Sequence, residues 1–86
     1  MNQTELPFFT LPSNPFSSGT QCHALYEWLR ERGEISTREI HRSGFETARI
    51  RSDIRPYLRR NGLDYRCKYL EPGNRLYQVV GGNHAN

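Results

Sequence analysis

Gly62 separates two kinds of hydrophobic pattern, and this change constrains the fold more than any other feature of the chain. Before it, four apolar residues recur at the spacing of one buried helical face: Ile50, Ile54, Tyr57 and Leu58. After it, the stretch "LDYRCKYL" (residues 63–70) alternates, which is the period of a half-buried strand. The sequence therefore predicts an α+β fold in which helices come first and strands last.

The alternating residues are expected to form a hairpin. The stretch "EPGN" (residues 71–74) carries a proline–glycine turn signal, and "RLYQVV" (residues 75–80) follows it. We therefore expect a two-stranded antiparallel β-hairpin over about 64–70 and 75–80. The alternation assigns the first strand to two faces, with Leu63, Tyr65, Cys67 and Tyr69 on one and Asp64, Arg66, Lys68 and Leu70 on the other.

The first helix is predicted over residues 21–32. Ser18 or Thr20 can cap its beginning, and Gly33 provides a left-handed stop. Trp28 lies on the same stripe as the leucines of this helix, so we expect it in the core rather than at a binding site.

A short strand at residues 34–35 and a second helix over residues 37–42 are expected next. Ser36 and Glu39 have the S-x-x-E spacing of a capping box, in which two backbone amides at the helix start are satisfied reciprocally. A helix of barely two turns is stable only when it is packed, so we expect Ile40 to point inward.

The third helix is predicted between a cap at Thr47 and a terminator at Gly62, with Pro56 inside it. Proline cannot donate to the preceding turn. Two outcomes are open: the helix kinks at Pro56, or it ends and a new turn begins with proline in a favoured early position. In both, residues 47–55 are expected to remain a straight unit.

The 86 residues fit one small domain. Residues 1–19 hold three of the five prolines and no basic residue, so we expect a flexible or extended N-terminal arm that is loosely held. The arm contains three phenylalanines: Phe8, Phe9 and Phe16. Either one of them packs over the edge of the domain or the arm docks on a partner. The folded domain is expected over residues 20–80, followed by a flexible C-terminal tail over residues 81–86.

The two cysteines, Cys22 and Cys67, are far apart, and we expect both as free thiols that serve as small core residues. A zinc site would be expected to show C-x2-C or H-x3-H spacing, which the chain lacks, so no metal is expected. No apolar run approaches ~20 residues, the length that spans a bilayer, and the N-terminus lacks a secretory signal pattern. We therefore expect a cytoplasmic location.

Positive charge is concentrated in the middle of the chain. All twelve basic residues lie between Arg30 and Arg75, and the net charge is +3. In helical projection, three arginines of the third helix lie roughly 100–180° from Ile50: Arg51, Arg55 and Arg59. No acidic residue is intermixed with this stripe. Because the arginine fork can engage phosphate or guanine with two hydrogen bonds, the stripe predicts a surface that binds a polyanion.

The element order and two segments resemble the small winged helix-turn-helix proteins of phages and prophages. The segments are "GEISTREIHRSGF" (residues 33–45) and "ARIRSDIR" (residues 48–55). In that family a Gly-x-Ile-Ser/Thr segment leads into a short helix, a Gly-hydrophobic turn and an Ala-Arg-Ile third helix. The resemblance covers about residues 20–80. Pro56 and the N-terminal arm depart from it.

The resemblance implies binding of double-stranded DNA, with the third helix in the major groove and the hairpin as a wing on the adjacent phosphate backbone. The residues expected at DNA are Arg38, Thr47, Arg49, Arg51, Ser52, Arg55, Arg59, Lys68, Asn74 and Arg75. Among them, Arg51 and Arg55 are expected at bases or phosphates, and the two hydroxyl residues as hydrogen-bonding support. Arg42 and Arg66 are further candidates for phosphate contacts.

Several roles stay open under this resemblance. The chain is expected to act in transcription regulation as a repressor or autoregulator, or as an excisionase-like factor, and a homodimer is compatible with each. A competing interpretation is a protein-interaction module, such as a phage protein that inhibits a host or replication protein through the arm. Neither His23 nor His41 belongs to a recognisable nucleophile–base set, so we expect neither an enzyme nor a cofactor. A phage-encoded chain would act in the host cytoplasm.

Overall fold

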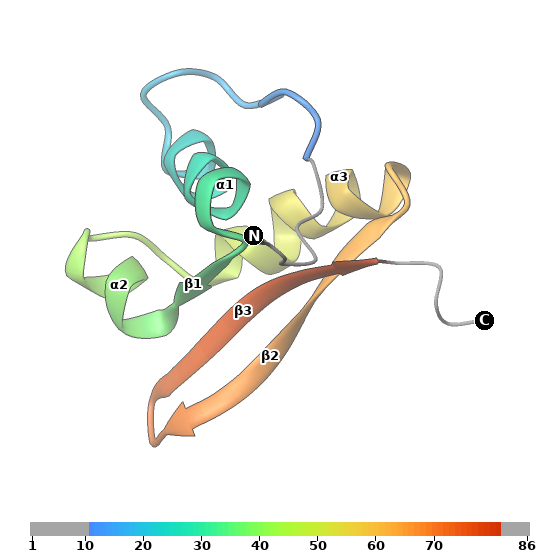
Figure 1. Ribbon diagram of the computed structural model, residues 1–86. Helices are drawn as coiled ribbons and strands as arrows, with labels where there is room; N and C mark the ends of the chain where they lie inside the picture. Colours follow the sequence, from blue (N-terminus) through green and yellow to red (C-terminus); the bar gives the residue numbers. More distant parts are fainter. Residues whose placement is uncertain (1–10, 82–86) are drawn as a thin grey trace, which may run out of the picture.

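The computed structural model of the chain describes residues 11–81; residues 1–10 and 82–86 lie outside this description. The elements are α1 (Gln21–Arg32), β1 (Glu34–Ser36), α2 (Thr37–Arg42), η2 (Ile50–Ile54), α3 (Arg55–Arg60), β2 (Leu63–Glu71) and β3 (Asn74–Gly81). A helical turn at residues 48–49, the π-helical η2 and α3 are continuous, and we call them the third helix (residues 48–60). In Figure 1 the β2–β3 hairpin crosses below α1 and the third helix, and its turn points away from them.

The first helix has the predicted bounds and caps. The hydroxyl of Thr20 accepts a hydrogen bond from the amide of His23, and Gly33 ends the helix with φ of 78°. A left-handed φ of this kind favours glycine because it has no Cβ. Trp28 is only partly buried and packs against the core from its edge, next to Phe45 with ring centroids 6.0 Å apart, so the expected place in the core is confirmed only in part.

The second helix begins with the predicted capping box. The side chain of Ser36 accepts from the amide of Glu39, and the Glu39 carboxylate accepts from the amide of Ser36 at 3.0 Å. Glu39 also takes two hydrogen bonds from Arg32, at 2.9 and 3.1 Å. These hydrogen bonds, led by those from Arg32, lower the pKa of the Glu39 carboxyl. Ile40 is fully buried, as predicted.

Of the two outcomes left open at Pro56, the second is found: a new α-helical segment, α3, begins at Arg55 with the proline in its first turn, although the chain stays helical throughout. The straight unit expected over residues 47–55 is instead largely π-helical. Pro56 lies in the first turn of α3, where a missing amide hydrogen costs little. The preceding turn is widened into η2, in which the amide of Arg55 donates to the carbonyl of Ile50, five residues back. A π-helical turn gives the proline ring room that a regular α-turn would deny it.

The sheet has three strands, whereas the sequence predicted a two-stranded hairpin. β1 pairs antiparallel with β3, and the strand order is β1-β3-β2. The hairpin is also longer at both ends than predicted, and its register shifts between Tyr69 and Glu71, which leaves Leu70 as a bulge. Three helices with this three-stranded antiparallel sheet are compatible with a winged helix.

The core lies between the helices and the base of the hairpin. Its fully buried large side chains are Leu25, Tyr26, Leu29, Ile35, Ile40, Ile50, Ile54 and Leu58. Tyr57, predicted on the same stripe, is only partly buried and packs at the edge of this core. Cys22 is partly buried, but Cys67 is exposed, so the prediction that both cysteines are core residues is wrong for Cys67. The reason is that β2 is an edge strand of the sheet, and only its first three residues and its last are partly buried.

Residues 11–19 form no helix or strand and end in a turn, and they are packed onto the domain rather than loosely held as was expected. Leu11 is buried, and the Tyr26 hydroxyl donates to the carbonyl of Pro12 at 2.8 Å. Phe16 meets the rings of Tyr26 and Tyr57 edge-to-face, at centroid distances of 5.8 and 6.1 Å. The interpretation that a phenylalanine packs over the domain edge is confirmed for Phe16.

The remaining predictions for the two ends of the chain fall largely outside the described residues. Phe8 and Phe9 lie within residues 1–10, and most of the expected tail lies within residues 82–86. Gly81 belongs to β3 and pairs with Leu63, so the folded domain extends at least one residue beyond its predicted end.

Candidate nucleic-acid interface

Three arginines lie along one side of the third helix, and we call them the arginine flank: Arg51, Arg55 and Arg59. Arg51 is exposed and forms no ion pair within residues 11–81. The flank faces the first residues of β2, because the guanidinium of Arg55 lies over the ring of Tyr65, 4.9 Å from its centroid. Burial raises the pKa of the Tyr65 hydroxyl, and the charges of Arg55 and Arg51 oppose that rise.

Asp64 binds the other two members of the flank. Its Oδ1 accepts from Nε of Arg55 at 2.9 Å, and its Oδ2 accepts from Nε of Arg59 at 3.1 Å. Asp64 is 17% exposed, whereas Arg59 is 59% exposed. The expectation that no acidic residue accompanies the stripe is therefore wrong: β2 turns back after the third helix and brings a carboxylate between two of its arginines.

The carboxyl of Asp64 stays ionised over a wide pH range. Burial alone would raise its pKa, but hydrogen bonds from Arg55, the amide of Tyr65 and Arg59 outweigh burial and lower the pKa. Each guanidinium uses only Nε for this contact. The terminal amino groups of Arg55 and Arg59 thus keep hydrogen-bond donors for another acceptor.

Arg49 lies on the opposite side of the third helix from the arginine flank. Its Nη1 donates to Asp53 at 2.9 Å, and its Nε lies 3.6 Å from Glu46. These contacts neutralise much of its charge, and they raise the pKa of Arg49, with the hydrogen bond that it donates to Asp53 as the main cause. Arg49 is therefore a weaker candidate for phosphate binding than Arg51.

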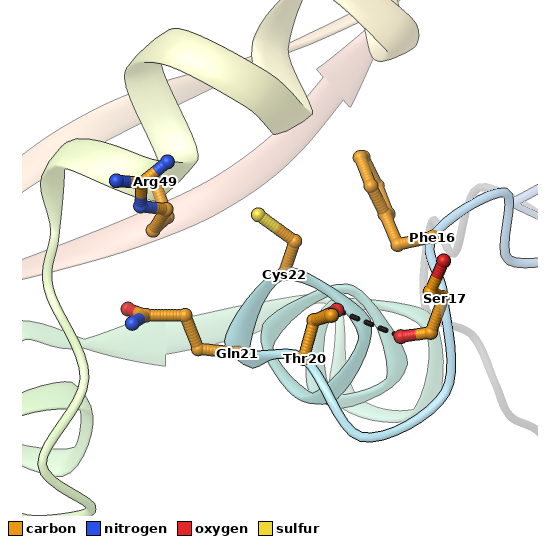
Figure 2. Close-up of a pocket in the computed structure, with 6 residues that line it drawn as sticks. All are labelled: Phe16, Ser17, Thr20, Gln21, Cys22 and Arg49. Atoms are coloured by element: carbon orange, nitrogen blue, oxygen red, sulfur yellow. Dashed lines mark hydrogen bonds between the residues drawn. The ribbon is translucent and has the colours of Figure 1, made fainter.

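An open hollow of about 470 Å³ lies on the Arg49 side, at the beginning of α1. Figure 2 shows Cys22 and Arg49 facing each other across it, from α1 and the third helix. The thiol of Cys22 donates to Asp53 at 3.3 Å. Burial, followed by this hydrogen bond, raises the pKa of the thiol, so Cys22 stays protonated and weakly nucleophilic at neutral pH.

The turn of the hairpin is fastened to the beginning of α2. Asn74 accepts from the amide of Arg38 at 3.0 Å and donates to Glu71 at 3.1 Å. The amide of Arg75 donates to the hydroxyl of Thr37 at 3.0 Å. Asn74 is only 8% exposed, so the expectation that its side chain is presented at the wing tip is wrong. Arg38 is exposed but forms an ion pair with Glu71.

The two faces of the hairpin differ in what they can contact. Arg75 is exposed and pairs directly with Tyr69, on the same face of the hairpin as Tyr65. Lys68 and Arg66 are exposed on the other face. The arginine flank contacts both faces at the beginning of β2, through Tyr65 on one and Asp64 on the other, whereas Arg75 lies near the hairpin turn.

Small residues separate the charged residues on the third helix. Ala48 and Ser52 are exposed, and the Ser52 hydroxyl donates to the carbonyl of Ala48 at 2.9 Å. The Ser52 oxygen still has accepting capacity. Thr47 is partly buried just before the helix, and its carbonyl accepts from the amide of Ile50 at 3.0 Å. A partner surface can approach the backbone at Ala48 and Ser52 because neither side chain is large.

The candidate interface therefore consists of the arginine flank, Ser52, Arg75 and the exposed Arg38. Sequence reasoning missed Asp64 and Tyr65 as members of this site. The strand alternation assigned them to opposite faces, and no sequence spacing indicates that both contact Arg55. Only the reversal of the chain at Gly62 brings the beginning of β2 against α3.

Within residues 11–81 no group of three or more histidine, cysteine, aspartate or glutamate side chains is arranged to hold a metal ion. No helix of the described part of the chain has both the length and the apolar character needed to cross a membrane. Comparison of the chain with known protein families, curated proteins and solved structures found no match.

Proposed function

We propose that this chain binds double-stranded DNA in a sequence-specific manner as a small winged-helix regulator, with the third helix in the major groove and the hairpin on the adjacent backbone. The observation that carries the proposal is the arginine flank, with Arg51 and Arg59 exposed and Arg55 half-buried, on the helix that also exposes the small residues Ala48 and Ser52. A major groove about 12 Å wide admits one helix, and arginine is the commonest reader of guanine.

Two further observations support the proposal. Arg75 is exposed near the hairpin turn, so the wing carries a cation of its own. The hairpin turn is held against α2 by Asn74 and Thr37, which gives the wing a fixed position. A fixed wing lowers the entropy that is lost on binding.

The net charge of the candidate interface predicts how binding depends on salt. The candidate interface contains five cations, Arg38, Arg51, Arg55, Arg59 and Arg75, and two carboxylates are paired with them, Asp64 and Glu71. The net charge is about three, so the slope of log affinity against log salt should be about −2.7. Between 50 and 200 mM salt the affinity should then fall about 40-fold.

The test is fluorescence anisotropy with a labelled random-sequence duplex, followed by selection of bound duplexes from a random pool. Binding at low salt, with this slope and with enrichment of a common sequence, is the expected result. Absence of binding at low salt would show that the proposed function is wrong. A salt-independent affinity would point to a contact that does not involve phosphates.

A protein-interaction module remains a second candidate because of two exposed apolar residues near the hairpin turn. Tyr69 is 66% exposed and Leu70 is 44% exposed. Apolar side chains at such a position suit a protein partner more than a phosphate backbone. The double variant Tyr69→Ser/Leu70→Ser separates the candidates: it should leave duplex affinity within a factor of about two if phosphate contacts dominate binding.

A further inference from the structure

Asp64 is placed to control how the two paired arginines of the arginine flank meet DNA. Its Oδ1 lies 2.9 Å from Nε of Arg55, and its Oδ2 lies 3.1 Å from Nε of Arg59. Its Oδ1 also accepts from the amide of Tyr65 at 2.8 Å, so the carboxylate is fixed by the backbone of β2. It is the least exposed partner in these ion pairs.

Within residues 11–81, the terminal amino groups of Arg55 and Arg59 form no hydrogen bond, because each guanidinium meets Asp64 through Nε. Two groups hold the guanidinium of Arg55: the Asp64 carboxylate, which accepts from Nε, and the ring of Tyr65, whose centroid lies 4.9 Å from the central carbon of the guanidinium. An arginine held in this way has lost most of its rotamer freedom before a ligand arrives. Its terminal amino groups form the two-donor edge that matches the O6 and N7 acceptors of guanine.

We propose that Asp64 is a positioning residue that sets the ratio of specific to non-specific DNA affinity. This inference rests on the proposed function. Asp64 acts on the two kinds of binding in opposite directions. It orients Arg55 and Arg59, which strengthens binding to a matching sequence. Its negative charge also offsets part of their positive charge, which weakens binding to any phosphate backbone.

The test compares two duplex probes: a duplex enriched from a random pool by the wild-type chain, and the unselected pool itself. Asp64→Asn keeps the size of the side chain and removes its charge. We expect its affinity for the enriched duplex to fall about tenfold, because the arginines lose their fixed orientation. We expect its affinity for the unselected pool to rise about two- to fivefold, because one more unit of positive charge is free.

The opposite signs distinguish positioning from the two simpler roles. A purely structural role for Asp64 would weaken binding to both probes, and a purely electrostatic role would strengthen both. Asp53→Asn is the matched control, because it removes the same charge from the opposite side of the third helix, where Asp53 pairs with Arg49. The control should change both affinities by a similar factor and leave their ratio unchanged.

Arg55→Lys provides a second route should Asp64→Asn not fold. It keeps the charge and leaves Asp64 in place, but a lysine lacks the planar fork. We expect loss of affinity for the enriched duplex with little change for the unselected pool. If a folded variant has the wild-type ratio of affinities for the enriched duplex and the unselected pool, the inference about Asp64 is wrong, although the chain still binds duplex DNA. A wild-type chain that binds neither probe refutes the proposed function itself.

Discussion

Arg51→Ala is the most direct test of the candidate interface. Arg51 is exposed and forms no ion pair within the described residues, so its removal breaks no internal ion pair there. Its guanidinium is also not offset by Asp64, unlike those of Arg55 and Arg59. The loss of affinity for DNA should therefore come from lost contacts with the duplex and not from a change of the fold.

The size of the effect depends on what Arg51 contacts. A bidentate contact to a guanine is worth about 1–3 kcal/mol, which is about 5- to 150-fold in affinity. A contact to phosphate alone would instead reduce the salt slope by about 0.9, from about −2.7 to about −1.8. The affinity would then fall about 12-fold, and no longer about 40-fold, between 50 and 200 mM salt.

The assay is fluorescence anisotropy with the enriched duplex and the unselected pool at several salt concentrations. Arg60→Ala is the matched control. Like Arg51, Arg60 is an exposed arginine without an ion pair in residues 11–81, but it lies outside the candidate interface, in the last turn of α3 before the chain turns into β2. The control should keep its affinity within a factor of about two. Both variants should have the melting temperature of the wild type.

The result that would refute the reasoning is an Arg51→Ala variant with unchanged affinity and unchanged salt slope. Equal losses for Arg51→Ala and Arg60→Ala would also refute it, because they would show that only the total charge of the chain matters. A loss for the enriched duplex alone would assign Arg51 to a base contact, and an equal loss for both probes would assign it to phosphate.

Three further predictions concern stability. Ile54→Ala should lower the free energy of unfolding by about 2–5 kcal/mol in urea titrations, because Ile54 is fully buried, and a smaller loss would mean that the core is not packed there. Tyr26→Phe should cost about 0.5–1.5 kcal/mol through the lost bond to Pro12. The pKa of Tyr26 is raised to about 12 in the folded chain, so its contribution to the free energy of unfolding is complete below about pH 10 and is lost as pH rises towards 12. Tyr26→Phe should lack this loss of stability at alkaline pH. A Tyr26→Phe variant that still shows the loss would exclude Tyr26 as its cause. The pKa of Asp64 is lowered in the folded chain, so its ion pairs with Arg55 and Arg59 add to the free energy of unfolding above about pH 4 and cease to do so below it. Asp64→Asn should therefore make the free energy of unfolding depend less on pH in the acid range. An unchanged dependence would contradict the role of these ion pairs.

Local chemistry made the beginnings and ends of the early elements predictable. Thr20 and Gly33 define α1, and the Ser36–Glu39 capping box defines the beginning of α2, because each depends on hydrogen bonds or dihedral angles within a few residues. The buried stripe of Ile50 and Ile54 followed from helical spacing in the same way. These features need no knowledge of the rest of the chain.

Contacts between distant residues were not predictable in the same way. Residues 11–16 carry no periodic pattern, yet Phe16 completes an aromatic cluster with Tyr26 and Tyr57. The third strand of the sheet arose because β1 pairs with β3, about 40 residues later in the chain. Neither partner could be inferred from spacing, since many strands can satisfy the same hydrogen-bonding groups.

The sequence by itself determined where the helices and the hairpin form and that arginines line one side of the third helix. Tertiary structure alone decided which of those arginines are free. Asp64 is in the next element along the chain, and only the turn at Gly62 carries it to Arg55 and Arg59. An ion pair depends on distance in space, and the strength of a charge at a surface depends on its neighbours, so a list of residues fixes the total charge but not its distribution.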